Sequence, residues 1–386
     1  MPDASAGVAS KLAFETAADD ATLAAAAGEW RALERRAAAG AQFYQSFGWV
    51  EAWWRCVGAP SGWRLRILLG RADGRLVLVW PLAIAPGRMC RTLAAAGGVL
   101  SPYSDAIVEP DDRTAAWLDA AVAAVAGWRD YDVVRLDDVR ADAVIAPHLA
   151  GWLGPPVRGD AAVHVDCAAF AGFDAFFAAM SQKSRQNQRR SRKALAQRGA
   201  IRSEIDNGGA AVDAILRQAI GFKQDWLKER GLAHEVLESD VALDFLIAAA
   251  RAGQADGTTV VSRLFLDGGL IAVGLGFLFN GRYNYYLGAF DQSLQELGPG
   301  RVQVEEALRW AFAHDVAAFD FMPPDTAAKA VWSRTKMPVE SYMAGRGVAG
   351  AFWGSFYPRR LRPGLKRLYN VLPRGLHRAA GRLVRR

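Results

Sequence analysis

The clearest hydrophobic pattern in the chain runs from Thr259 to Phe290, where three apolar stretches alternate with short polar breaks. The breaks are Asp267-Gly268-Gly269 and Asn280-Gly281. Both favour tight hairpin turns, because Asn, Asp and Gly tolerate positive φ better than other residues. The pattern therefore predicts an antiparallel meander with strands at 259–266, 270–279 and 283–290.

A glycine-bearing loop, Asp291 to Arg301, follows the meander and leads into an amphipathic helix predicted at Val302–His314. Gly298 and Gly300 lack a Cβ, so the backbone can approach a ligand closely there. The amide groups and the dipole at a helix N-terminus favour a negative charge. We therefore predict an anion site at this loop. A strand at 317–321, a helix at 326–335 and a strand at 339–344 complete this half.

The first half shows a similar order of elements. Ser46 is the predicted N-cap of an aromatic helix. The other strands predicted before the meander lie at 11–17, 64–69, 75–84, 105–108, 132–136 and 161–165. The other helices predicted there lie at 22–39, 115–128, 141–153, within 173–197, and at 211–230 and 241–253. Both halves then read helix, helix, antiparallel strands, helix, strand, helix, strand. The predicted fold class is α/β (α+β), with two tandem domains that each hold a mixed central sheet flanked by helices.

We predict domains at 1–165 and 166–345 and a basic tail at 346–386. Of the two domains, the second keeps the glycine loop. The net charge is +7 over 386 residues. The tail holds eleven Arg and Lys and no acid, so subtraction (7 − 11) leaves −4 for residues 1–345. A body of this charge argues against an ordinary nucleic-acid-binding protein.

Composition restricts the compartment and the cofactors. The chain has no run of about 20 apolar residues and no secretory signal at its start, so we expect a cytoplasmic protein. Its three cysteines, Cys56, Cys90 and Cys167, have no metal-ligand spacing. They are expected to be small buried hydrophobic residues in a reducing compartment, and no metal site is predicted.

Three motifs carry a resemblance to a known family. They are Gln45 to Trp54, the basic segment Ser184 to Leu195, and the stretch from Tyr285 through Gly298-Pro299-Gly300 to Trp332. Together they resemble acyltransferases of the GNAT superfamily of the CelD/BcsL type, which are related in fold to the FemX-like tandem-GNAT aminoacyltransferases. The resemblance covers residues from about 40 to 345. It implies acetyl-CoA, or another acyl-CoA, as co-substrate.

The resemblance also implies roles for individual residues. Gln295, Gly298, Gly300 and Arg301 would hold the coenzyme A diphosphate. Asp291 is the candidate general base, although an Asp that opens a loop often bonds its own backbone instead. Tyr286 and Lys329 are further catalytic candidates, and Trp332 is a candidate substrate-binding residue. Asp320 lies on a short apolar strand, so we expect it to pair with a basic group.

The basic segment predicts a second kind of contact. Arg185, Arg189 and Arg192 lie at spacings of three and four, so they form one helical stripe. The stripe favours an anionic acceptor, and a solvated helix face is the alternative. In the tail, 346–386, basic residues accompany leucines at helical spacing, which favours peripheral contact with an anionic membrane. A disordered tail is the alternative there.

The favoured function is acyl-CoA-dependent N- or O-acyl transfer to a small-molecule or lipid-linked glycan acceptor. The resemblance implies a cell-envelope or exopolysaccharide precursor as that acceptor. One alternative keeps the fold and takes aminoacyl-tRNA as donor. Another is a non-catalytic scaffold of a polysaccharide synthesis machine, because Pro324 and Ala328 depart from the family pattern.

Overall fold

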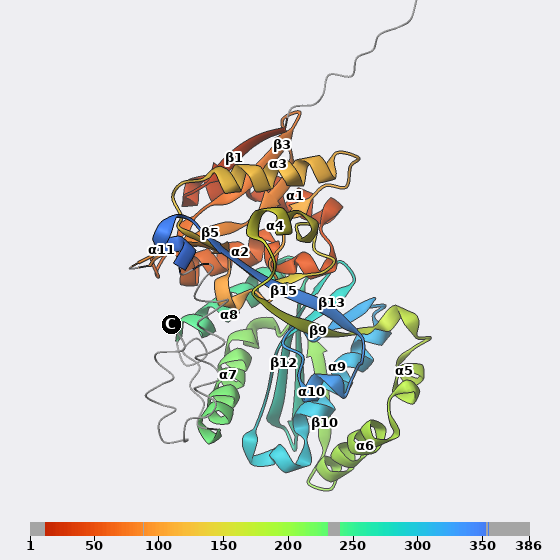
Figure 1. Cartoon of the computed structure of the whole chain (residues 1–386). Helices are drawn as coiled ribbons and strands as arrows, with labels where there is room; N and C mark the ends of the chain where they lie inside the picture. The colour runs from red at the N-terminus through yellow and green to blue at the C-terminus, as the bar shows by residue number, and fades with distance from the viewer. Residues whose placement is uncertain (1–11, 88, 231–239, 353, 355–386) are drawn as a thin grey trace, which may run out of the picture. The chain divides into compact units, whose positions relative to one another are not determined.

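The computed structural model describes residues 12–87, 89–230, 240–352 and 354 (Figure 1). Contacts divide the chain into two compact units, each assembled from separated segments. Unit 1 comprises 1–29, 62–159 and 340–386, and unit 2 comprises 30–61 and 160–339. The predicted domains divide the chain differently, since 30–61 was assigned to the first domain and belongs to unit 2. Most of the predicted tail, including 355–386, lies outside the described residues.

Unit 1 contains a four-stranded antiparallel sheet in the order β1-β3-β4-β7 and a second run of strands, β2-β5-β6-β8. Its elements are β1 (Leu12–Ala17), β2 (Arg64–Leu65), β3 (Ile67–Ala72), β4 (Arg75–Trp80), β5 (Leu82–Ala85), β6 (Thr92–Ala95), β7 (Ile107–Val108), α3 (Thr114–Gly127), β8 (Val133–Arg140), α4 (Ala146–Leu153) and α11 (Gly347–Ala351). Helices α3 and α4 pack apolar side chains against these strands in one core. The helix α1 (Asp20–Ala37) and the strands β9 (Arg158–Asp166) and β15 (Lys336–Gly345) carry the chain between the units.

Unit 2 is built on six strands in the order β10-β11-β12-β13-β14-β9. Its elements are α2 (Phe47–Trp53), α5 (Phe173–Ala179), α6 (Gln182–Ala196), β10 (Ile201–Asp206), α7 (Val212–Glu229), α8 (Asp240–Ala255), β11 (Thr259–Leu266), β12 (Gly269–Phe279), β13 (Arg282–Phe290), α9 (Pro299–Ala313), β14 (Ala318–Asp320) and α10 (Ala327–Ala330), with short 3₁₀ turns η1 (Gly40–Gln45), η4 (Cys167–Ala169), η5 (Gly209–Ala211) and η6 (Gln292–Leu297) and a π turn η2 (Trp54–Gly58).

The predicted meander is present within one residue at every strand end. The turn residues Asp267 and Asn280 have φ values of 46° and 42°, and the glycine after each also has positive φ. Such turns match the right-handed twist of paired strands, which is why these two dipeptides position the hairpins correctly.

Several local predictions need correction. Segment 173–197 forms two helices, α5 and α6, because the chain is extended at Met180 and Ser181 and the Ser181 hydroxyl caps the second. The loop after β13 contains the 3₁₀ turn η6, and α9 begins at Pro299 rather than Val302. Proline is suited to the first helical position because its φ is already helical. The helix predicted at 326–335 is the shorter α10.

The aromatic helix α2 explains why 30–61 belongs to unit 2. The Ser46 hydroxyl caps it by accepting from the Trp49 amide, as predicted. Just before it, Phe43 stacks on Phe277 of β12, with ring centroids 4.4 Å apart. Trp49 meets Phe245 of α8 edge to face at 4.8 Å. Buried aromatic pairs of this kind hold the segment to the sheet face.

Candidate functional site

Unit 2 contains a cavity of about 790 Å³ at the place where two parallel strands separate. Strand β13 pairs with β14 at three positions, ending with Asn284 opposite Asp320. Immediately beyond, residues 285–286, 288–290 and 321–323 line the cavity from its two sides. The strands therefore splay after Asn284, and the edge of β13 there faces the cavity instead of a neighbouring strand. This volume is typical of small-molecule sites.

A β-bulge shapes the β13 wall of the cavity. Leu275 pairs with Leu287, but Gly276 pairs with Tyr285, so Tyr286 is an extra residue in β13. Successive side chains normally point to opposite faces of a strand. The bulge breaks that alternation, and both Tyr285 and Tyr286 line the cavity. Bulges of this kind occur next to active sites, where they redirect a side chain.

The glycine loop forms one end of the cavity, and its two glycines are required for packing reasons that the motif does not reveal. Gly298 has φ of 70°, and a Cβ there would lie 2.5 Å from the Ser191 hydroxyl of α6. A Cβ at Gly300 would lie 2.9 Å from the Phe290 ring. Pro299 contributes no amide hydrogen, so the first-turn amide groups of α9 start at Gly300.

Basic side chains surround this end. Arg301 in the first turn of α9 is exposed and lines the cavity, as does Gln295. Arg230, at the C-terminal end of α7, donates to Gln295 Oε1 at 2.9 Å. Its guanidinium also lies over the Trp226 ring, 4.6 Å from the centroid. Helix dipole and two arginines thus favour a phosphate-bearing group here.

Lys329 lies in the same cavity and is held by the loop that follows β14. Its Nζ donates to the carbonyl oxygens of Met322 at 2.9 Å and Pro324 at 3.1 Å. Burial, together with a smaller effect of the nearby Lys223 ammonium, lowers the pKa of Lys329 to about 8, although three neighbouring aspartates oppose the shift. A lysine in this range changes protonation state near neutral pH, which is the property required of a proton carrier.

Two tyrosines face the cavity with their phenols protonated. Burial raises the pKa of both Tyr285 and Tyr286. The Tyr285 hydroxyl donates to Gln303 Oε1 of α9 at 2.6 Å. A Cβ at Gly288 would collide with that hydroxyl, so Gly288 leaves room for the Tyr285 ring. Tyr286 packs edge to face on Trp49 at 5.2 Å.

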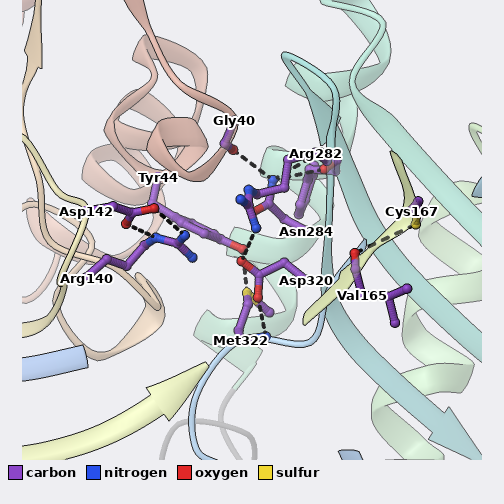
Figure 2. Close-up of polar contacts among 11 residues, drawn as sticks. Gly40, Tyr44, Arg140, Asp142, Val165, Cys167, Arg282, Asn284, Asp320 and Met322 are labelled. Carbon is purple, nitrogen blue, oxygen red and sulfur yellow. Dashed lines mark hydrogen bonds and ion pairs between the residues drawn. The ribbon is translucent and has the colours of Figure 1, made fainter. Parts of the chain in front are cut away.

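Asp320 anchors the end of β14 just before the cavity begins. Figure 2 shows its carboxylate between Arg282, whose Nη1 lies 3.1 Å from Oδ2, and the Met322 amide, 2.8 Å from Oδ1. The expected basic partner is therefore Arg282. The Tyr44 hydroxyl donates to the Met322 sulfur at 2.7 Å. These bonds fix the segment whose carbonyl oxygens hold Lys329.

Seven of the residues predicted from sequence line this one cavity: Tyr286, Gln295, Gly298, Gly300, Arg301, Lys329 and Trp332. Asp291 does not line it. Its Oδ1 accepts from the Ser293 amide at 2.9 Å and from the Ser293 hydroxyl at 2.7 Å, which caps η6. This is the backbone-bonding arrangement that the sequence left open for Asp291.

The arginine stripe of α6 also lies outside the cavity lining. Arg185 donates to the carbonyl oxygens of Ala178 and Met180, at the end of α5. Arg192 pairs with the acidic side chains of Glu305, at 3.1 Å, and Glu306 on α9. Arg189 is exposed, with its guanidinium 5.9 Å from the Phe177 ring centroid. The geometry thus gives Arg185 and Arg192 contacts within the fold.

Sequence reasoning missed several residues of the site, chiefly Lys223, Arg230, Tyr285 and Gln303. One signal was present. Lys223 falls within the apolar stripe of α7, whose buried members include Leu216, Ala219, Ile220 and Leu227. Across the described residues that line the cavity, the charged side chains are Lys223, Arg230, Arg301 and Lys329, with no carboxylate among them.

Neither a metal-binding cluster nor a membrane-spanning helix is found in the described part of the chain. No group of three or more His, Cys, Asp or Glu side chains there is arranged to hold a metal ion. None of the helices there combines the length and apolar character that a membrane span requires.

Comparison with known proteins agrees with this geometry. A family model described as an acetyltransferase (GNAT) domain matches residues 182–330. The structure of FemX is 14% identical, covers 82% of this chain and 95% of its own, and superposes with a TM-score of 0.58. A conserved protein of unknown function from Bacteroides thetaiotaomicron is 13% identical over 85% of this chain and 99% of its own, with a TM-score of 0.52. No curated protein sequence matches the chain.

Sequence identities of 13–14% to these solved structures indicate a shared fold alone. The matched family model covers the span from α6 to α10, which contributes nearly all of the cavity lining. The structures confirm the predicted mixed α/β fold class, and the matched domain confirms the prediction of a GNAT-type acyltransferase.

Proposed function

We propose that the chain transfers an acyl group from coenzyme A to an amine or hydroxyl acceptor in the unit 2 cavity. One observation carries the proposal: a single cavity joins the glycine loop, with Gly298 and Arg301, to Lys329 and Tyr286. A donor site and a proton-transfer site are thus continuous, as acyl transfer requires.

The charges of the cavity fit an acyl-CoA donor. The diphosphate belongs at the start of α9, where the Gly300 amide, Arg301 and Arg230 converge. The pantetheine arm belongs along the free edge of β13, because a strand edge offers amide and carbonyl groups to an extended ligand. The amide groups of that edge also supply donors for the developing oxyanion. The donor brings the thioester, and the chain supplies position and proton transfer.

Lys329 is the proposed proton acceptor in place of Asp291. A neutral amine has two N–H bonds, which the carbonyl groups of Met322 and Pro324 can accept. Its lone pair is then available for the proton of the attacking amine or hydroxyl. As the new bond to the acyl carbon forms, the carbon–sulfur bond breaks. Tyr286, protonated in the cavity, gives the leaving thiolate its proton and recovers one from Lys329 through solvent.

For the acceptor, we keep the proposal drawn from the sequence resemblance to the CelD/BcsL type, a cell-envelope or exopolysaccharide precursor. The FemX-like fold supports a second donor, aminoacyl-tRNA, as the alternative. The body of net charge −4 and the compact anion site at Gly298 favour coenzyme A over a long nucleic acid.

Thermal-shift titration of the full chain tests the donor. The ligands are acetyl-CoA, coenzyme A, aminoacyl-tRNA and acetyl-pantetheine, which has the thioester but lacks the diphosphate. Acetyl-CoA at 100 times its Kd should stabilise the chain by about 2.7 kcal/mol, a shift of several degrees, while acetyl-pantetheine should give little. Stabilisation by aminoacyl-tRNA alone would make aminoacyl-tRNA the donor in place of acyl-CoA. The absence of stabilisation by any of the ligands would favour a non-catalytic scaffold.

A further inference from the structure

Lys223 is a cation in a place where the helix pattern calls for an apolar residue. It lies on α7 between Ile220 and Leu227, both buried, and its side chain lines the cavity. A lysine in such a stripe loses hydration, and burial accordingly lowers its pKa. Holding the ammonium here costs free energy unless an opposite charge approaches it.

No such charge lines the cavity among the described residues, since its four charged side chains are all basic. Within the described residues, the Lys223 ammonium lies over the face of the Trp226 ring, 5.4 Å from the centroid. Arg230 lies on the same helix and its positive charge adds to the lowering of the Lys223 pKa. Among the described residues, the cavity lining therefore carries four positive charges and no negative one, which favours an anionic ligand.

Lys223 shares an aromatic neighbour with Arg230, the arginine that bonds Gln295 of the glycine loop. The Lys223 ammonium and the Arg230 guanidinium lie 5.4 and 4.6 Å from the centroid of the same Trp226 ring. The Lys223 charge also acts on Lys329, the proton-transfer residue that lines the same cavity. An anion bound by Lys223 would thus lie beside the reacting groups, where the acceptor must lie.

We infer that Lys223 binds an anionic group, a phosphate or a carboxylate, on the acceptor, beside the nucleophile that Lys329 deprotonates. The inference rests on the proposed function and names the class of its acceptor. The rest of the acceptor would then contact the uncharged side chains of Trp332 and Tyr286. It also links binding to catalysis, because an anion next to Lys223 offsets the positive charge that acts on Lys329.

Calorimetric titration of the full chain at saturating coenzyme A isolates this site, because the glycine loop is then filled. Pyrophosphate and succinate are the probes, one for each anion chemistry. The variant is Lys223→Gln, which keeps length and polarity and removes the charge. The control is Lys228→Gln on the same helix, since Lys228 is exposed, pairs with Asp225 at 3.3 Å and lies outside the cavity lining.

We expect the wild type and K228Q to bind at least one probe and K223Q to lose roughly 10-fold or more of that affinity, as expected for a charge-assisted bond. Coenzyme A affinity should be the same in all three. The probe that binds more tightly identifies the acceptor's group as phosphate or carboxylate.

Two results would overturn the inference. One is the absence of anion binding by the wild type when coenzyme A is bound. The other is an equal loss of coenzyme A and probe affinity in K223Q, which would place Lys223 in the donor site. Failure of the proposed function looks different: coenzyme A then does not bind at all, and the titrations with pyrophosphate and succinate, run without it, still report on Lys223.

Discussion

Lys329 gives the sharpest prediction, because its protonation state sets how much of the enzyme is ready to accept a proton. Its pKa is lowered from 10.5 to about 8. At pH 7 an ordinary lysine is neutral in only about 0.03% of molecules, whereas a lysine of pKa 8 is neutral in about 9%. The cavity thus raises the competent fraction roughly 300-fold.

The pKa can be measured without knowing the acceptor. Trace acetic anhydride acetylates amines in proportion to their neutral fraction, and mass spectrometry reports each lysine separately. Labelling of Lys329 should rise with pH and level off above about 8, while that of Lys228 on the surface should keep rising. In K223Q the Lys329 midpoint should move to higher pH, since a neighbouring positive charge is gone.

Turnover separates a base from a fixed cation. With an amine acceptor found by thiol release from acetyl-CoA, kcat/KM should rise tenfold per pH unit below 8 and then become flat. Lys329→Gln should lose about 10²–10⁴-fold. Lys329→Arg should lose a similar factor, because its guanidinium keeps the charge but does not deprotonate.

Three outcomes would refute the reasoning. Labelling of Lys329 with a midpoint near 10.5 would show that burial does not shift it. Substantial activity in K329R would make the positive charge, not the proton transfer, the working feature. A wild-type pH profile that parallels the residual profile of K329Q would assign the pH dependence to the acceptor's own ionisation.

Three further predictions concern the loop, a buried carboxyl and the tail. Gly298→Ala should weaken acetyl-CoA binding at least 10-fold through positive φ and the clash beside it, whereas Gly268→Ala, with similar φ and open space, should keep full affinity; equal affinity in both would contradict the loop's role. Burial raises the pKa of Glu34 to about 7, so the folded state binds extra protons between pH 4.5 and 7 and this contribution to stability is lost as pH rises through that window. In urea denaturation, Glu34→Gln should therefore raise the free energy of unfolding at pH 8 by at most about 3 kcal/mol and change it little at pH 4.5. An equal gain in unfolding free energy at both pH values would count against the pKa shift. If the tail contacts membranes, deleting 355–386 should abolish co-sedimentation with anionic vesicles, and unchanged co-sedimentation would end that idea.

Local chemistry allowed most of unit 2 to be predicted. Asn280-Gly281 determines its hairpin by dihedral preference alone. The helix after the glycine loop was also predicted, although it begins at Pro299 instead of Val302. Strand β10 was missed because its residues, Ile201 to Asp206, are mostly polar, as is typical of an edge strand, and none of them is buried.

The features that depend on long-range packing could not be predicted. The bulge at Tyr286 is visible only in the register of two strands. Lys223 reaches the cavity because α7 packs near β13, a contact between segments about 60 residues apart. Asp291 and Arg192 have residue types suited to catalysis or anion binding, but local capping and an ion pair with Glu305 occupy them in the fold. A motif identifies candidates, and only the tertiary structure decides which of them share a space.

The interleaving of the two units has a consequence for making the protein. Unit 2 needs Phe43 and Trp49 from near the start of the chain and β12 to β14 from near its end. During synthesis, the aromatic helix leaves the ribosome some 200 residues before the sheet that covers it. An excised fragment that begins at Asp160 would leave the Phe277 ring without its stacking partner, so fragments should be designed to retain the early helix or to supply it as a separate peptide.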